Sequence, residues 1–251
     1  MKFIHLSDLH IHKFDSDNKA IERRLEYIRQ NYSSHYLIVT GDIVDDGHAK
    51  QYKNAFDYLE PFMGRIFISP GNHDFGAAGN FYSQERAERF DAMLSVPLQQ
   101  GGTFTGDSTP VVNIVRDDYD KIMLIALDTN LETDHPFDFA CGAVGASQLS
   151  SLKTILASPV SIGMIKIVFF HHDPFIHNNP FMELEDARLL MRALFNRVDI
   201  VLFGHKHVSS QWQNMNGIKY VLASDNSFGN DYAREIVIQS GTITVNPIPI
   251  I

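Results

Sequence analysis

Two histidines separated by one residue, His205 and His207, follow a short apolar segment late in the chain. Residues 199–203 have the composition of a buried strand, and Gly204 marks the end of that strand. Side chains at positions i and i+2 of an extended segment point to the same side. The two imidazoles are therefore expected to face one ligand site, and imidazole is a common ligand of transition metals.

Four other strand-like segments also end in side chains that can bind metal ions. These are Asp8 and His10 after residues 2–7, Asp42 after 36–41, Asn72, His73 and Asp74 after 65–69, and His171 and His172 after 164–170. One such residue alone is typical of a turn or a helix cap, but five strand ends favour a common site, because ligands bind at the carboxyl ends of strands in α/β sheets. Carboxylate, amide and imidazole groups without a thiolate suit Zn, Mn, Fe, Co or Ni.

Strand-like and helix-like segments alternate along the 251 residues, which is the pattern of an α/β fold. Strands are predicted at 2–7, 36–41, 65–69, 111–116, 121–127, 164–170, 199–203, 218–223, 234–239 and 242–247, and helices at 18–31, 48–60, 81–95, 147–157 and 184–197. Turns within segments 111–127 and 218–247 predict antiparallel hairpins beside a parallel region, and hence mixed sheets. Because no linker or internal repeat divides the chain, we expect a single domain, 1–251.

The chain is acidic, with 21 basic against 30 acidic side chains and a formal net charge of -9. This charge, and the lack of a basic cluster, disfavour binding of extended nucleic acid. The single cysteine, Cys141, excludes an intramolecular disulfide and fits a reducing compartment. No apolar run approaches the ~18 residues of a membrane span, and no signal-peptide pattern is present, so a cytoplasmic protein without a membrane span is expected. The oligomeric state stays open.

In chain order, these strand-end motifs resemble the five motifs of the calcineurin-like metallophosphoesterases. They are Asp8 with His10, Gly41 with Asp42, Gly71 to Asp74, His171 to Pro174, and Gly204 to His207, and they span residues 8–207. The resemblance implies a four-layer α/β/β/α sandwich of two mixed β-sheets flanked by helices. It also implies a dinuclear metal site at the C-terminal strand ends, with two divalent or mixed-valence ions of the Mn, Fe, Zn, Co and Ni class.

The resemblance further implies a role for each motif residue. The ligands of one ion are Asp8, His10, Asp42 and His207, and those of the other are Asp42, Asn72, His171 and His205, so that Asp42 bridges the two ions. His73 is the implied proton donor or transition-state stabiliser, with Asp74 as its orienting partner. Either His171 or His172 could bind the ion. The family pattern favours His171 as the ligand and implies that His172 lies next to the ligands without binding the ion.

Two divalent ions about 3.5 to 4 Å apart can produce a hydroxide from water near neutral pH and hold phosphate oxygens for in-line displacement. Two such ions, the carboxylates of Asp8 and Asp42, and a hydroxide leave a net charge of about +1, which attracts a phosphate ester to an acidic protein. The expected function is therefore a metal-dependent phosphoesterase with a small phosphate ester as its substrate.

Related protein phosphatases usually carry an arginine after the second-motif aspartate and a glutamate after the third-motif histidine. This chain has no arginine in residues 43–47 and has Asp74 after His73. Both departures favour a phosphodiesterase for cyclic nucleotides or glycerophosphodiesters. The alternatives are a nucleotide-linked pyrophosphate hydrolase, a phosphomonoesterase, or a non-catalytic metal-binding scaffold.

Substrate specificity is expected in the loops at 75–82, 128–145 and 175–181, with the 128–145 loop as either a lid or simple surface. The candidate contacts are Phe81, Tyr82, His135, His177, Asn178 and Asn179. The histidines without motif support, which are His5, His12, His35 and His48, are expected to be structural or solvated.

Overall fold

The computed structural model describes residues 1–251 except 107–109, 131–139, 176–180 and 228–229. Its α-helices are α1 (Lys19–Asn31), α2 (Ala49–Leu59), α3 (Asn72–Phe75), α4 (Gln84–Phe90), α5 (Ala146–Ala157) and α6 (Ala187–Leu194). Helix α4 continues into a π-helical turn at Asp91–Ser95. Within the described ranges, no helix combines the length and apolar composition needed to cross a bilayer.

Most strands belong to two mixed sheets. The first has the order β13-β12-β1-β2-β3, formed by β1 (Lys2–Leu6), β2 (Tyr36–Thr40), β3 (Ile66–Ser69), β12 (Tyr232–Gln239) and β13 (Thr242–Pro249). The second has the order β10-β11-β9-β8-β7-β6, formed by β6 (Val111–Arg116), β7 (Lys121–Ala126), β8 (Ile165–Phe169), β9 (Ile200–Phe203), β10 (Ser210–Met215) and β11 (Ile218–Ala223). A short pair, β4 (Gly76–Ala77) and β5 (Phe81–Tyr82), lies apart from them.

Parallel strands form the centre of each sheet. Strands β1, β2 and β3 are parallel in the first sheet, and β7, β8, β9 and β11 are parallel in the second. The carboxyl ends of the parallel strands of a sheet gather at one edge, where loops can present side chains to a ligand.

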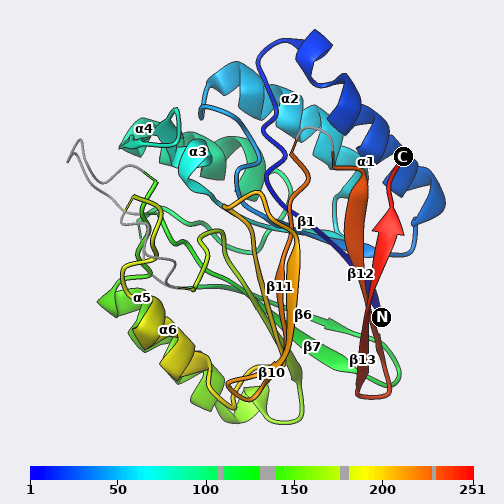
Figure 1. Ribbon diagram of the computed structural model, residues 1–251, viewed down its shortest axis with the longest axis vertical. Helices are drawn as coiled ribbons and strands as arrows, with labels where there is room; N and C mark the ends of the chain where they lie inside the picture. Colours follow the sequence, from blue (N-terminus) through cyan, green and yellow to red (C-terminus); the bar gives the residue numbers. More distant parts are fainter. Residues whose placement is uncertain (107–109, 131–139, 176–180, 228–229) are drawn as a thin grey trace.

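Two hydrophobic clusters fill the space around the sheets. The larger joins strands of both sheets with helices α1 and α2, and the smaller joins the second sheet with α5 and α6. Along β7, Ile122 and Leu124 belong to the larger cluster whereas Met123 and Ile125 belong to the smaller, so the second sheet is buried on both faces. Figure 1 shows α1 and α2 at the top, α5 and α6 at the lower left, and the strands between them.

The prediction of an α/β chain with mixed sheets is confirmed. All ten predicted strands are present with ends within two residues of those expected, because each is a compact β-branched or aromatic segment. Helix 81–95 begins instead at Gln84 and ends as a π-helical turn, since residues 81–82 form β5. Strand β10 was not predicted, because this edge strand is mostly polar in sequence, with Trp212 and Met215 as its apolar residues.

The pairing expected within residues 218–247 is partly wrong. Strands β12 and β13 form a hairpin, but β11 pairs with β10 and β9 in the second sheet, while β12 pairs with β1 in the first. The chain therefore crosses from one sheet to the other between β11 and β12. Periodicity identifies a strand but does not select its partner, which is why the sequence did not reveal this crossing.

Burial of His5 on β1 makes stability depend on pH. Its side chain is fully buried, and its Nε2 lies 2.9 Å from Thr40 Oγ1. Burial, and then the charge of Arg234, lower the pKa of His5 well below the usual value of 6.5. As the pH falls through about 6.5, the unfolded chain binds a proton that the folded chain does not, so stability is full above this pH and is lost below it.

We expect His5→Gln to weaken this dependence. Between pH 7.5 and 5.5, the free energy of unfolding of the wild type should fall by about 1 kcal/mol more than that of the variant, because one extra proton changes stability by about 1.4 kcal/mol per pH unit. Urea unfolding of both metal-free proteins, followed by circular dichroism at the two pH values, measures the difference. Equal losses would contradict a buried, uncharged His5.

Candidate metal centre

The carboxyl ends of β1, β2 and β3 in the first sheet and of β8 and β9 in the second deliver the predicted ligands. The ligands that follow these strands within a few residues are Asp8 and His10, Asp42, Asn72, His171, and His205 and His207. Each strand is rigid because it is paired on both sides or packed in the core, so the short segments beyond it have defined positions.

Asp8, His10 and His207 form the first group. One ligand atom from each lies within 4.8 Å of those of the other two, and His207 Nε2 is 4.0 Å from Asp8 Oδ1. The rings of His10 and His207 stack with their centroids 5.2 Å apart. Asp8 is fully buried whereas His207 is 43% exposed, so the group is open to solvent on one side.

Asp42, Asn72, His171 and His205 form the second group. His171 Nε2 lies 3.1 Å from Asp42 Oδ2 and 3.2 Å from His205 Nδ1, and this Nδ1 lies 3.1 Å from Asn72 Oδ1. Ligand atoms around one tetrahedral ion are separated by roughly 3.4 Å when the bonds are about 2.1 Å, so these spacings suit a shared ion. Asp42 Oδ2 is also 3.9 Å from Nε2 of His10 in the first group.

Several buried atoms of these groups have no hydrogen-bond partner among the described residues. They are Asp8 Oδ2, His10 Nε2 and His205 Nε2. An unpaired buried polar atom costs about 1–3 kcal/mol, and protein interiors rarely contain three of them together. A bound cation could pair Asp8 Oδ2 and His10 Nε2, whereas His205 faces its group through Nδ1, so these two atoms show that the first group fits a divalent metal ion.

The protonation states also favour a bound cation. Burial opposes a charge on His171, but the carboxylates of Asp42 and Asp8 raise its pKa to about 9. Burial also opposes the charge on Asp42, yet His171 holds its pKa well below the usual range. Burial, together with the charge of His171, lowers the pKa of His205 to about 3. A proton on His171 thus supplies the positive charge that the two carboxylates require.

Five of the seven predicted ligands have a left-handed backbone. Their φ angles are 57° for Asp8, 45° for His10, 49° for Asp42, 77° for His205 and 50° for His207. Side chains other than glycine seldom adopt this region, and each instance costs of order 1–3 kcal/mol. These sharp bends immediately after the strands turn the side chains toward one point. Strain concentrated in this way is characteristic of functional sites.

The structure corrects the role expected for Asp74. Its fully buried carboxylate accepts hydrogen bonds from the main-chain N–H groups of Gly71 and of residues 43 and 44, at 2.8 to 3.3 Å. The ring of His73 instead donates from Nδ1 to the carbonyl oxygen of Asp45, at 2.7 Å. The prediction that Asp74 orients His73 is therefore wrong. Asp74 joins the loops after β2 and β3, because nearby main-chain donors satisfy its acceptors.

Carboxylates that sequence analysis did not assign support the first group. Asp45 Oδ1 lies 3.6 Å from Nδ1 of His10, and Asp225 Oδ1 lies 3.6 Å from Nδ1 of His207. A group that binds the second nitrogen of a metal-binding histidine fixes its ring orientation. Asp225 could have been found from the sequence, because it follows strand β11 just as each predicted ligand follows its own strand.

In the second group, a main-chain oxygen fixes the ring orientation of a histidine. The carbonyl of Thr40 accepts a hydrogen bond from Nδ1 of His171 at 2.8 Å, which leaves Nε2 directed at Asp42. No residue type marks such a contact, so it could not be read from the sequence. It requires close approach at Gly41, where an added Cβ would lie 2.7 Å from His171 Nδ1.

Residues 1–209 match the family model described as calcineurin-like phosphoesterase. The chain belongs to this phosphoesterase family. It is 26% identical over 206 residues to a 3′,5′-cyclic-nucleotide phosphodiesterase of Nostoc sp., a match that covers 78% of this chain and 64% of that protein. It is 25% identical over 244 residues to a cAMP/cGMP dual specificity phosphodiesterase of Mycobacterium tuberculosis, with 91% and 68% covered. This phosphoesterase chain thus spans about two thirds of the length of these relatives.

Solved structures resemble the phosphoesterase in fold. A dimetal phosphatase from Danio rerio superposes with a TM-score of 0.73 at 12% identity, covering 100% of this chain and 96% of that one. A putative 5′-nucleotidase from Staphylococcus aureus gives a TM-score of 0.60 at 15% identity, covering 100% and 54%. At these identities the likeness concerns the fold alone.

The structure distinguishes the two adjacent histidines of the phosphoesterase. Both are fully buried, but His171 faces Asp42 whereas His172 has its Nδ1 2.8 Å from Thr129 Oγ1. We expect His171→Ala to lose one ion after reconstitution with Zn or Mn, and His172→Ala to retain both. Metal content of the dialysed proteins, measured by mass spectrometry, tests this. Loss of an ion from the second variant alone would reverse the assignment.

The loops predicted to set specificity are only partly described. His135, His177, Asn178 and Asn179 lie outside the described residues. Phe81 and Tyr82 form β5, which pairs with β4. Gly79, between these strands, has φ +71° and approaches so closely that an added Cβ would lie 2.6 Å from Nε2 of His73. The loop at 75–82 therefore packs against the predicted proton donor.

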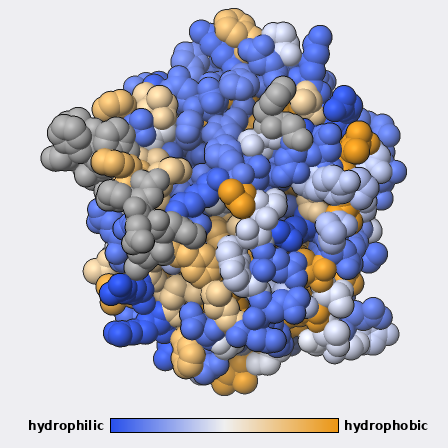
Figure 2. Space-filling view, in the orientation of Figure 1, coloured by the Kyte–Doolittle hydropathy of each residue, from blue (hydrophilic) through white to orange (hydrophobic). Residues whose placement is uncertain are grey.

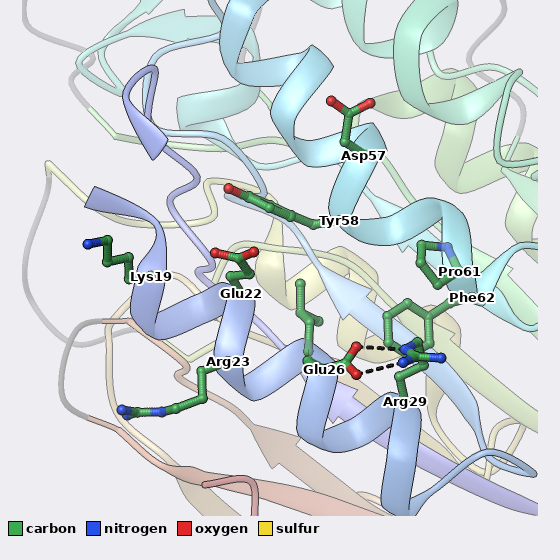
Figure 3. A pocket seen from close by; sticks show the side chains of 10 residues that line it. Lys19, Glu22, Arg23, Glu26, Arg29, Asp57, Tyr58, Pro61 and Phe62 are labelled. Carbon is green, nitrogen blue, oxygen red and sulfur yellow. Dashed lines mark hydrogen bonds and ion pairs between the residues drawn. The ribbon is translucent and has the colours of Figure 1, made fainter. Parts of the chain in front are cut away.

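A separate groove lies between α1 and α2, with a volume of about 410 Å³ (Figure 3). Its walls carry charges of both signs, including the ion pair of Glu26 with Arg29, and none of the predicted ligands line it. Figure 2 shows that hydrophilic residues cover most of the surface over these two helices. This groove has the character of a solvated surface and is distinct from the metal-binding groups.

Proposed function

We propose that this protein is a dinuclear-metal-dependent phosphodiesterase that hydrolyses small phosphodiesters of the cyclic-nucleotide or glycerophosphodiester type. The observation that carries the proposal is the meeting of two compatible ligand groups with His73 beside them, since His73 shares a cluster with His10 and Asp42. The names of the bacterial relatives, which are cyclic-nucleotide phosphodiesterases, support the choice of a diester.

The proposal includes the architecture around the site. We infer a single domain, 1–251, in which helices α1 and α2, the two sheets, and helices α5 and α6 form four successive layers. The clusters on both faces of the second sheet support this order. The metal site is placed at the C-terminal strand ends of both sheets, which explains why residues from five strands can contribute to it.

In this proposal, Asp8, His10, Asp42 and His207 would hold the first ion, and Asp42, Asn72, His171 and His205 would hold the second. When bound, two divalent ions supply positive charge for the phosphate and lower the pKa of a water molecule. The two carboxylates balance part of that charge, and the buried imidazoles bind as neutral donors.

His73 supplies the proton that the departing alcohol needs. Because its Nδ1–H donates to the carbonyl of Asp45, Nε2 is the nitrogen available to the substrate. Its main-chain N–H donates to Asp42 Oδ1 at 2.9 Å, which ties the proton donor to the proposed bridging carboxylate. This contact between His73 and Asp42 thus fixes the distance between the proposed phosphate site and the proton donor.

A substrate panel tests the proposal. The metal-stripped protein, reconstituted with Mn²⁺ or Zn²⁺, would be assayed with a cyclic nucleotide, a glycerophosphodiester, a nucleotide pyrophosphate and an aryl phosphomonoester. We expect the highest kcat/KM on a diester. A higher value on the monoester or the pyrophosphate would overturn the substrate class, and two bound ions without any hydrolysis would indicate a metal-binding scaffold.

A further inference from the structure

His12 lies in a pocket of about 360 Å³ that opens beside the first ligand group. His10, His73 and His207 also line this pocket. His12 was expected to be structural or solvated, but its side chain is 42% exposed and forms part of the pocket wall. Because the proposed proton donor His73 lines the same pocket, this is where the departing alcohol lies in the proposed reaction.

The position of His12 is fixed from two sides. Its main-chain N–H donates to Asn18 Oδ1 at 2.7 Å, and its carbonyl accepts from Nδ2 of Asn18 at 2.9 Å and of Asn54 at 3.0 Å. Both asparagines are buried. The ring Nδ1 lies 3.3 Å from Asp45 Oδ2. Two buried amides thus hold the main chain of His12, and a carboxylate contacts its ring, which reaches the pocket; binding residues are preorganised in this way.

The rest of the wall favours hydroxyl groups over a second anion. Arg24 is the cation of this wall, and it is already paired with Asp231 at 2.9 Å and donates to the carbonyl of Asn226 at 3.2 Å. Asp45 and Asp17 add negative charge that would repel a second phosphate. A hydroxyl can donate to such a carboxylate and accept from an imidazole N–H, and both partners are present at His12 and Asp45.

We propose that His12 and Asp45 bind a second hydroxyl group of the departing alcohol, so that the enzyme prefers diesters whose leaving alcohol carries a neighbouring hydroxyl. This inference rests on the proposed function. In the reaction, water adds its oxygen to phosphorus, the P–O bond to the alcohol breaks, and the departing oxygen receives a proton, giving a phosphomonoester and a free alcohol. Two kinds of diester carry such a neighbouring hydroxyl group. It is the 2′-hydroxyl of ribose in a 3′,5′-cyclic nucleotide and the secondary hydroxyl of glycerol in a glycerol ester.

A diester with two competing alcohols tests this preference within one molecule. Hydrolysis of glyceryl propyl phosphate releases either glycerol and propyl phosphate or propanol and glycerol phosphate, which ³¹P NMR distinguishes. The product ratio does not depend on metal content or on the fraction of active enzyme. We expect the wild type to release mainly glycerol, and His12→Phe to lower the ratio of glycerol to propanol release by tenfold or more.

Two further variants complete this arm of the experiment. His12→Gln keeps a hydrogen-bonding side chain and should restore part of the preference, and His12→Ala, which also removes the hydrogen bond, replaces His12→Phe if that variant does not fold. His48→Gln removes a histidine at the N-terminus of α2, outside the pocket, and should leave the ratio unchanged.

The second arm compares cyclic AMP with its 2′-deoxy analogue. Removal of the hydroxyl should lower kcat/KM of the wild type by tenfold or more, and that of His12→Phe by less than twofold. If the His12 variants change the result in only one of the two experiments, the inference is supported. The experiment that responds then identifies the alcohol as glycerol or ribose. An unchanged product ratio and an unchanged deoxy effect in the His12 variants would overturn the inference. Failure of the metal-loaded wild type to hydrolyse any diester would overturn the proposed function instead.

Discussion

Replacement of Asp42 by asparagine is expected to remove metal binding and most of the activity while leaving the fold intact. Asp42 Oδ1 accepts the N–H of His73, and Oδ2 faces Nε2 of both His171 and His10. Asparagine has nearly the same shape, but it removes the charge and turns an acceptor into an N–H₂ donor directed at these ligands. Loss of an outer partner of a metal ligand already costs about 10- to 100-fold, so loss of the proposed bridging carboxylate should lower kcat by about a thousandfold or more.

Asp46→Asn is the matched control for this experiment. Asp46 lies four residues further along, and its carboxylate is 3.5 Å from Arg86 at the partly exposed surface, where an ion pair contributes about 0–1 kcal/mol. Metal content after reconstitution and hydrolysis of an aryl phosphodiester should be normal in this control. Two bound ions and near-normal turnover in Asp42→Asn would remove Asp42 from the proposed bridging position.

His73→Asn is expected to separate proton donation from metal binding. General acid catalysis contributes about 10²- to 10⁴-fold, and this contribution is needed most when the leaving alcohol is a strong base. Turnover of an alkyl diester should therefore fall by about 10²- to 10⁴-fold, whereas an aryl diester with a good leaving group should lose about tenfold or less. The main-chain N–H that binds Asp42 remains in the variant, so both ions should stay bound.

A series of diesters with leaving groups of increasing basicity measures this difference. The slope of log kcat against leaving-group pKa should become steeper in the variant than in the wild type. Because His73 also shares a cluster with His10 and Asp42, metal content must be measured in parallel. Equal losses along the whole series, or loss of an ion, would assign His73 to ligand binding and contradict its role as an acid.

The meeting of the candidate ligands was predictable because of a simple relation between strands and loops. Apolar segments identify strands, parallel strands place their carboxyl ends at one edge, and polar residues just beyond them must meet there. Asp8, Asp42 and His171 illustrate this relation, since they come from three strands of two sheets and still share one cluster. The type and order of the residues were sufficient for this step.

Contacts that depend on tertiary structure were not predictable. The hydrogen bond of His73 goes to the carbonyl of Asp45 and not to neighbouring Asp74, because both side chains reach the loop after β2 but the carboxylate of Asp74 is already paired there with the main-chain N–H groups of residues 43 and 44. His12 carries no motif, and its place in the pocket depends on buried Asn18 and Asn54. Such contacts are set by which loops lie opposite one another, and local periodicity contains no information about that.

The pairing of β1 with β12 has a consequence for the order in which the protein can assemble. Strand β1 leads to Asp8 and is held by residues near the other end of the chain: Phe3 lies opposite Ile236, and the N–H of Ser7 donates to Asn226 Oδ1. On the ribosome, the first motif to be synthesised must wait for partners that emerge more than 200 residues later. Contacts of such long sequence separation form slowly, so we expect the candidate metal centre to be among the last parts of the protein to mature.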